Sequence, residues 1–206
     1  MKVCLIRPPT ITTAEAVGED AAPPLGVAYL AGSLLAAGHD VTIIDALGEA
    51  LSRYDRIDYL PTGLRHGLAD DEILSRIPQD VEVIGISIMF SLEWPFTRDL
   101  TTMIRKAFPD AFLVAGGEHI TALPEFSLSE CPAINACALG EGEQIIVIWS
   151  RRCRTAARWR RSTAFACART AAWFAPARRS GSARSTPCPV LPGSGCLSRN
   201  ILARDL

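Results

Sequence analysis

The sequence predicts an α/β protein in which residues 1–144 form a doubly wound, five-stranded parallel sheet, and three observations lead to this prediction. Short apolar runs alternate with segments in which apolar residues recur at helical spacing. The connections between them are short and rich in proline and glycine. The strongest strand signal, residues 82–89, is nearly all apolar and is typical of a central strand that is covered on both faces. Strands and helices that alternate in this way form parallel sheets with right-handed crossovers, of Rossmann-like or flavodoxin-like type.

The first predicted elements begin at the amino terminus. Residues 2–7 form an apolar run that a proline pair stops, which indicates a buried first strand. Pro23–Pro24 are suited to the first turn of a helix, and Gly38 ends that helix in a left-handed cap. The β-branched run at residues 41–45 predicts the second strand. Residues 46–68 are polar and carry no assignable pattern.

The remaining elements follow in the same alternating order. Acidic residues favour the start of a short helix, and a stripe of apolar residues at fourfold spacing predicts a longer one. Prolines end both. The predicted helices are residues 70–77, 95–108 and 121–128, and the predicted third, fourth and fifth strands are residues 82–89, 111–115 and 134–139.

The charge of the chain changes sharply near Gln144. Residues 1–144 hold 9 basic and 21 acidic residues, a net charge of −12, whereas residues 145–206 hold 12 arginines, no lysine and one acid, a net charge of +11. The periodic pattern also ends there, so we predict a domain over 1–144 and a tail over 145–206 that is disordered or translated out of frame. The absence of lysine disfavours the alternative of a nucleic-acid-binding arm.

The amino terminus and the cysteines indicate a cytoplasmic protein. Only four apolar residues precede Arg7, which is too few for a signal peptide. The longest uncharged run, residues 21–38, is too short to span a membrane. The seven cysteines contain no CxxC pair, and the three within residues 1–144 lie among apolar neighbours, as buried free thiols do in a reducing compartment.

Two common functions of doubly wound domains lack their motifs here. The loop after the first strand, residues 7–13, has no glycine, which disfavours a dinucleotide site. A phosphoacceptor domain needs an acidic pair after the first strand and an aspartate after the third, and neither is present. Glu141 and Glu143 leave open an acid/base enzyme, although carboxylates in turns more often cap helices or face solvent.

Six short motifs follow one another along residues 2–144: KVCLIRPP at 2–9, PLGVAYLAGSLL at 24–35, GHDV at 38–41, IGIS at 84–87, GGEH at 116–119 and GEGE at 140–143. In this order and spacing they resemble the cobalamin-binding domain at the amino end of cobalamin-dependent radical S-adenosylmethionine enzymes. The resemblance implies that a corrinoid lies at the carboxyl ends of the strands, with its nucleotide tail inserted into the sheet.

The resemblance also implies a set of contact residues. Backbone without side chains at Gly116 and Gly117 would make room for the tail, although tight turns alone would also explain these glycines. Ser87 and Ser91 look like hydroxyl residues that contact the tail in related domains, and bonding of Ser91 to backbone is the alternative. The implied cofactor-binding residues are Ser87, Ser91, Gly116, Gly117, Glu118, His119, Gly140 and Glu141.

No catalytic or metal-ligating residue is assigned. The DxHxxG motif that supplies a lower histidine ligand to cobalt is absent, so we expect cobalamin bound without one, and His119 to cap a helix or touch the corrin rim. The CxxxCxxC motif of the radical domain is also absent, which assigns the iron–sulfur cluster and S-adenosylmethionine to a domain outside this chain. The alternatives are a non-catalytic α/β fragment without a cofactor and a protein that binds nucleic acid through its arginines.

Overall fold

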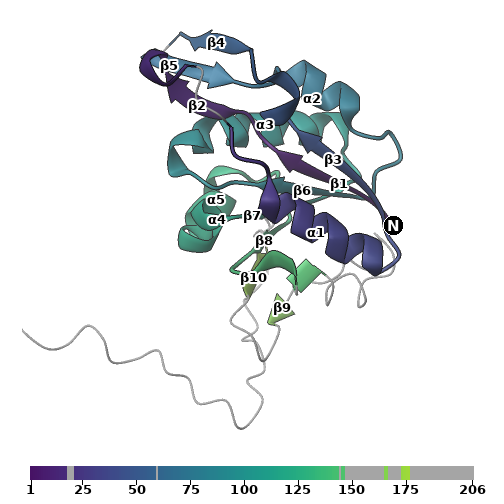
Figure 1. Ribbon diagram of the computed structural model, residues 1–206. Coiled ribbons are helices and arrows are strands. Elements are labelled where there is room, and N and C mark those ends of the chain that lie inside the picture. The colour runs from purple at the N-terminus through teal and green to yellow at the C-terminus, as the bar shows by residue number, and fades with distance from the viewer. Residues whose placement is uncertain (18–20, 59, 144, 147–164, 167–172, 177–206) are drawn as a thin grey trace, which may run out of the picture.

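Five parallel strands form the centre of the fold, which confirms the predicted doubly wound α/β class (Figure 1). The computed structural model describes residues 1–17, 21–58, 60–143, 145–146, 165–166 and 173–176. The strand order is β3-β1-β6-β7-β8, and each of these strands pairs in parallel with its neighbour. The strands are β1 (Lys2–Arg7), β3 (Asp40–Asp45), β6 (Val83–Ser87), β7 (Phe112–Gly116) and β8 (Ala136–Ala138).

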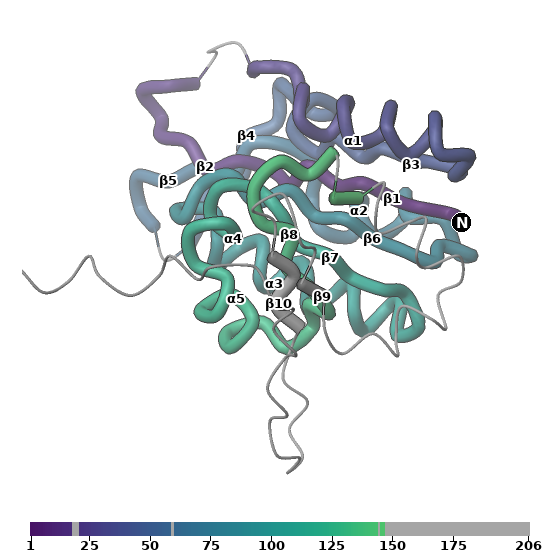
Figure 2. The backbone as a smooth tube through the Cα atoms, turned by 90° about the horizontal axis from the view of Figure 1, so that it is seen from below, coloured from purple at the N-terminus to yellow at the C-terminus, as the bar shows by residue number. Residues whose placement is uncertain are grey.

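Helices cover both faces of this sheet. Successive strand residues alternate between the faces, so Cys4 and Ile84 belong to one apolar cluster, while Val3 and Val83 belong to the other. α2 and α3 pack on the first cluster and α1 on the second (Figure 1). Figure 2 shows α4 and α5 together at one end of the sheet, next to β8. The helices are α1 (Leu25–Ala36), α2 (Asp70–Arg76), α3 (Trp94–Ala107), α4 (Glu118–Ala122) and α5 (Pro124–Glu130).

Two short helices stand where the sequence predicts one over residues 121–128. α4 ends at Ala122 and α5 begins at Pro124, and Leu123 between them has backbone angles outside the helical region, with φ −132° and ψ 52°. Proline lacks an N–H and restricts the residue before it, so it opens a new helix here instead of continuing the first one. The prediction of a single helix is therefore wrong.

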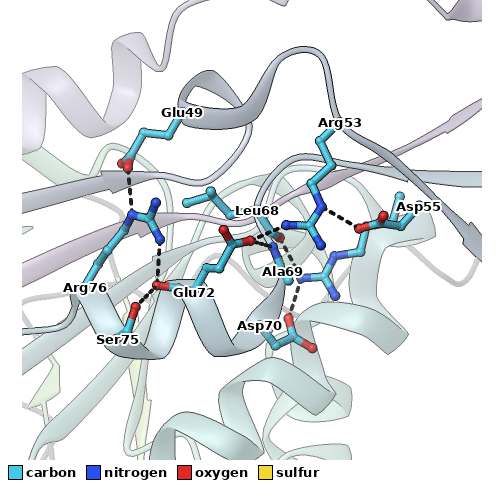
Figure 3. Close-up of polar contacts among 10 residues, drawn as sticks. Glu49, Arg53, Asp55, Leu68, Ala69, Asp70, Glu72, Ser75 and Arg76 are labelled. Atoms are coloured by element: carbon cyan, nitrogen blue, oxygen red, sulfur yellow. Dashed lines mark hydrogen bonds and ion pairs between the residues drawn. The ribbon is translucent and has the colours of Figure 1, made fainter.

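Residues 46–68, which carry no assignable pattern, supply most of a small antiparallel sheet. Its order is β2-β5-β4, and β2 comes from the segment that follows β1. Arginines attach this region to α2 through carboxylates, among them Arg53 to Glu72 and Arg76 to Glu49 (Figure 3). The elements are β2 (Thr10–Thr13), β4 (Tyr54–Ile57) and β5 (Leu60–His66), with 3₁₀ turns η1 (Ala14–Ala16), η2 (Gly48–Ala50) and η3 (Ser91–Glu93).

The large sheet continues beyond β8 with two strands that the sequence does not predict. β10 (Trp173–Pro176) pairs with β8 in antiparallel orientation, and β9 (Phe165–Ala166) pairs with β10. Ile145, at the start of the predicted tail, is buried in the cluster beneath α1. Most of residues 145–206 lie outside the described residues, so the domain boundary at residue 144 and the character of the tail remain predictions. Within the described part of the chain, no helix combines the length and the apolar character that crossing a membrane requires.

Candidate functional site

A cavity of about 240 Å³ lies between α1 and the parallel sheet. Its inner part is lined by hydrocarbon side chains of β1, α1, β6 and β7, and its mouth lies at the carboxyl ends of the strands, where doubly wound sheets bind ligands. The inner lining includes Val3, Leu5, Val27, Leu30, Val83 and Val114, and the mouth is lined by Ser87, Gly116, Gly117, Glu118, Thr121 and residues 140–143.

Several glycines border this space. Gly85 and Gly116 stand on the strand positions that face α1, and Gly26 lies on α1 itself. A Cβ at Gly116 would meet its closest neighbours at an ordinary 3.6 Å, and a Cβ at Gly26 would meet nothing within 4 Å. Packing within the protein therefore does not require glycine at either position, and both leave room beside the cavity.

Gly117 has a different reason to be glycine. Its φ of 106° lies in the left-handed region, and a Cβ there would come within 2.4 Å of the carbonyl oxygen of Ile88. That carbonyl accepts the His119 N–H at 3.3 Å, and the Ile88 N–H donates to the Gly116 carbonyl at 2.7 Å. The tight turn thus joins the ends of β6 and β7. Gly140 also has a positive φ of 79°, and its N–H donates to Thr121 Oγ1 at 3.0 Å.

His119 is buried, with only 3% of its surface exposed, and both of its ring nitrogens face serines. Ser127 Oγ donates its hydrogen to the Leu123 carbonyl at 2.7 Å, so it accepts from Nε2–H of His119 at 3.3 Å. Nδ1 of the neutral ring then accepts the hydrogen of Ser91 Oγ at 2.8 Å. Burial lowers the pKa of His119, which agrees with a neutral ring. The ring also stacks on Trp94, with centroids 4.8 Å apart.

Carboxylates surround the mouth of the cavity. Glu118 and Glu141 are exposed and Glu143 is half-buried, and all three line the opening. None of them takes part in an ion pair among the described residues. The described residues also contain no group of three histidine, cysteine, aspartate or glutamate side chains placed to hold a metal ion. The mouth is thus rich in hydrogen-bond acceptors and suits a ligand that carries N–H or O–H donors.

The structure brings six of the eight predicted site residues together at the cavity mouth and places two elsewhere. Ser91 and His119 do not line the cavity and instead bond to each other beside it. The six are Ser87, Gly116, Gly117, Glu118, Gly140 and Glu141.

The sequence reasoning missed the lining on the helix side. Gly26, Val27 and Leu30 of α1 were not predicted, although a glycine in an uncharged helix is a signal that could have indicated them. The inner strand residues were also missed. They alternate with core residues of the opposite face, and the pattern alone does not reveal that this face is incompletely filled.

Comparison with known proteins gives one family and several relatives. The family model of the B12 binding domain matches residues 11–148, more than half of this chain. An uncharacterised methyltransferase of Pyrococcus horikoshii is 34% identical over 143 residues, which cover 69% of this chain and 27% of that protein. The cytidylyl-2-hydroxyethylphosphonate methyltransferase of Streptomyces wedmorensis is 32% identical over 127 residues, which cover 61% and 24%.

A third relative belongs to a different reaction class. The anaerobic magnesium-protoporphyrin IX monomethyl ester cyclase of Synechocystis is 31% identical over 150 residues, which cover 71% of this chain and 26% of the cyclase. The chain therefore spans about a quarter of the length of each of these relatives.

Proposed function

Because this chain belongs to the B12-binding domain family, we propose that it binds cobalamin, with the nucleotide tail in the cavity between α1 and the sheet and the corrin ring over the cavity mouth. The observation that carries this proposal is the cavity itself, which opens at the carboxyl ends of the strands and is bordered by Gly26 and Gly116, two glycines that packing does not require. Its volume of about 240 Å³ is below the ~300 Å³ of pockets that enclose a drug-sized ligand, so it suits the tail and not the macrocycle.

The residues at the mouth fit the polar parts of such a ligand. Ser87 and Thr121 offer hydroxyls next to the backbone of Gly116 and Gly117, which suits the hydroxyl groups of a sugar. The carboxylates of Glu118 and Glu141 would accept hydrogen bonds from amide groups at the edge of the corrin. When bound, cobalamin would supply a cobalt ion able to carry a methyl group, and the chain's own task is to hold and orient it.

We propose that no histidine of this chain ligates the cobalt. Histidines occur at positions 39, 66 and 119, and none of them lines the cavity. Both ring nitrogens of His119 are bonded to serines, and Nε2 of His66 faces the Leu51 carbonyl at 2.7 Å. We therefore expect cobalamin bound here to lack the spectroscopic signature of histidine coordination.

The relatives and the sequence motifs also point to the class of reaction in which this domain takes part. Two of the relatives are methyltransferases and one is a cyclase, and the sequence motifs resemble those of cobalamin-dependent radical S-adenosylmethionine enzymes. We propose that the domain presents its corrinoid to chemistry of that kind in the cytoplasm.

Buried free thiols at Cys4, Cys131 and Cys137 fit a reducing compartment such as the cytoplasm. The sequence contains no CxxxCxxC, so the test of the 206-residue chain measures binding and not turnover.

Titration of the full chain with hydroxocobalamin tests the proposal. We expect a change in the corrin absorbance and retention of about one equivalent through desalting. Gly26→Leu should place a side chain in the cavity and weaken binding by about tenfold or more, whereas Gly32→Leu is the matched control. Gly32 lies on the same helix, and a Cβ there would also meet nothing within 4 Å, but it does not line the cavity.

Two outcomes would contradict the proposal. Absence of any spectral change or retention with the folded wild-type chain would favour the alternative of an α/β fragment that binds no cofactor. Equal loss of binding in Gly26→Leu and Gly32→Leu would show that the cavity is not where the ligand lies.

A further inference from the structure

We infer that the cavity selects cobamides by the base of their nucleotide tail, favouring a benzimidazole-type base over a purine. This inference rests on the proposed function, because it assumes that the tail enters the cavity. It adds a specificity that the family relationship does not supply. The physical argument compares what the inner lining can offer with what each kind of base requires.

The inner lining offers hydrocarbon and no side-chain hydrogen-bonding group among the described residues. The cavity runs along β6 from Ser87 at its mouth to Val83 at the start of the strand, a distance of about 13 Å at 3.3 Å per residue. The lining residues that lie away from the strand ends include Gly85 and valine, leucine and isoleucine side chains. These residues are Val3, Leu5, Val27, Leu30, Val83, Val114 and Ile145.

The strand backbone behind this lining is also engaged. β1 pairs with β3 on one side and β6 on the other, and β6 pairs with β1 and β7. Val3 lies opposite Val83 in this register, and Val83 lies opposite Phe112. The N–H and C=O groups of a central strand form hydrogen bonds with the two neighbouring strands. They are therefore not free to bond a base that lies on the face of the sheet.

The two kinds of base differ in what they lose on entering such a space. A dimethylbenzimidazole is planar, carries two methyl groups and has a single free ring nitrogen, so apolar contact dominates its transfer from water. A purine such as adenine carries an amino group and several unsubstituted ring nitrogens. Each polar group buried without a partner loses its hydrogen bonds to water and weakens binding.

The size of the cavity supports a ligand group as its occupant. Part of the cavity's volume of about 240 Å³ lies against the inner lining, where buried water would need two to four polar partners. The inner lining provides none through its side chains. A flat aromatic base fills such a space with dispersion contacts that water cannot replace.

Competition binding to the full chain tests the inference with three probes. They are cobalamin, an adenine-based cobamide with the same corrin, and cobinamide, which lacks the nucleotide tail. We expect cobalamin to bind about tenfold or more tightly than the adenine-based cobamide, since at least one purine polar group stays unpaired. We expect cobinamide to bind more weakly than cobalamin, because it leaves the cavity unfilled.

A pair of valine-to-threonine variants separates the lining from general effects on the fold. Val114→Thr places a hydroxyl in the cavity and should reduce the preference for cobalamin. Val41→Thr introduces the same hydroxyl on β3, where the side chain packs against the same apolar cluster but does not line the cavity. The Val41→Thr variant should therefore keep the wild-type ratio. If Val114→Thr fails to fold, the wild-type ratio still decides the inference.

The outcomes distinguish this inference from the proposed function. Failure of cobalamin itself to bind would overturn the proposed function and the inference together. Tight binding of cobalamin with equal binding of the adenine-based cobamide would overturn base selection alone. Equal binding of cobalamin and cobinamide would also overturn the inference, because it would show that the tail contributes nothing.

Discussion

Adjacent glycines at the end of β7 are glycine for different physical reasons, and their substitutions should separate stability from binding. Gly117→Ala should reduce the free energy of unfolding by about 1–3 kcal/mol, because alanine is strained at a φ of 106° and its Cβ would collide with the Ile88 carbonyl. Gly116→Ala should leave stability unchanged or raise it by up to ~1 kcal/mol. Denaturant unfolding of both variants measures this difference.

A larger side chain at Gly116 tests whether the ligand binds at the same site. Gly116→Val should weaken cobalamin binding by about tenfold or more, because the branched side chain occupies the mouth of the cavity. Wild-type affinity in Gly116→Val would argue against a ligand at this position, and wild-type stability in Gly117→Ala would argue against the tight turn.

His119 should make stability depend on pH. Burial lowers its pKa in the folded chain below the ordinary value near 6.5, so the unfolded chain binds a proton first as the pH falls. The stability that the neutral ring contributes is therefore complete above pH ~6.5 and declines below it. His119→Gln should lower the free energy of unfolding at pH 7.5 by about 1–3 kcal/mol, through loss of its contacts to the two serines.

The comparison of unfolding midpoints at pH 7.5 and pH 5.5 checks this sign. Wild type should lose more stability between these pH values than His119→Gln does. The pKa of His39 is also lowered by burial, so His39→Gln serves as a control that keeps the His119 contribution. An identical pH dependence in wild type and His119→Gln would contradict a buried neutral ring.

At the scale of elements, Glu72 joins α2 to the small antiparallel sheet (Figure 3). Its carboxylate accepts the Ala69 N–H at 2.9 Å, at the start of the helix, and also pairs with Arg53. Glu72→Ala should cost about 1 kcal/mol, chiefly from the lost cap, because half-exposed ion pairs contribute little. Asp71→Ala removes a neighbouring acid from the same first turn and should cost only a few tenths of a kcal/mol.

Urea unfolding of the two variants measures the difference, and cobalamin titration supplies a second readout. Neither residue lines the cavity, so both variants should bind cobalamin as wild type does. A stability loss in Asp71→Ala as large as that in Glu72→Ala would mean that general charge near the helix start, and not the cap, stabilises α2.

Sequence and structure agree best on elements whose signals are local. β6 was predicted from a nearly continuous apolar run, and α3 from apolar residues at fourfold spacing, and both signals lie within short windows of sequence. β2 and β5 were not predicted, because Thr10 lies opposite His66, and a pairing between residues so distant in sequence leaves no local pattern. The sequence predicted one helix in place of α4 and α5, because the helical spacing of apolar residues continues across Pro124. The helical backbone itself is interrupted there.

At the scale of the whole molecule, ligand binding should raise the stability of the fold. A ligand that binds the folded chain alone adds about 2.7 kcal/mol to the free energy of unfolding at a hundredfold excess over its Kd. Cobalamin should therefore raise the Tm in a concentration-dependent way, and cobinamide should raise it less. If the chain is unfolded, desalted to remove cobalamin and refolded, its Tm should return to that of the free chain. A Tm independent of cobalamin concentration would contradict binding to the folded state.

The site shows the same division between local and non-local information. The motifs that carry the family resemblance predicted six residues that line the cavity mouth, since these residues lie at or directly after the ends of strands, which meet at one edge of a parallel sheet. Ser91 and His119 were assigned to the same edge, yet they bond to each other across 28 residues and do not line the cavity. That partnership depends on side-chain directions, which the strand order does not specify.

The sequence by itself determined the fold class, the order of most strands and helices and the family, because apolar periodicity and short motifs act over a few residues. Tertiary structure alone decided where empty space remains. The face of the sheet opposite α2 and α3 is covered by α1 and Ile145 among the described residues, so a cavity lies beneath them. Whether a surface is filled depends on every element packed against it, and no local stretch of sequence carries that information.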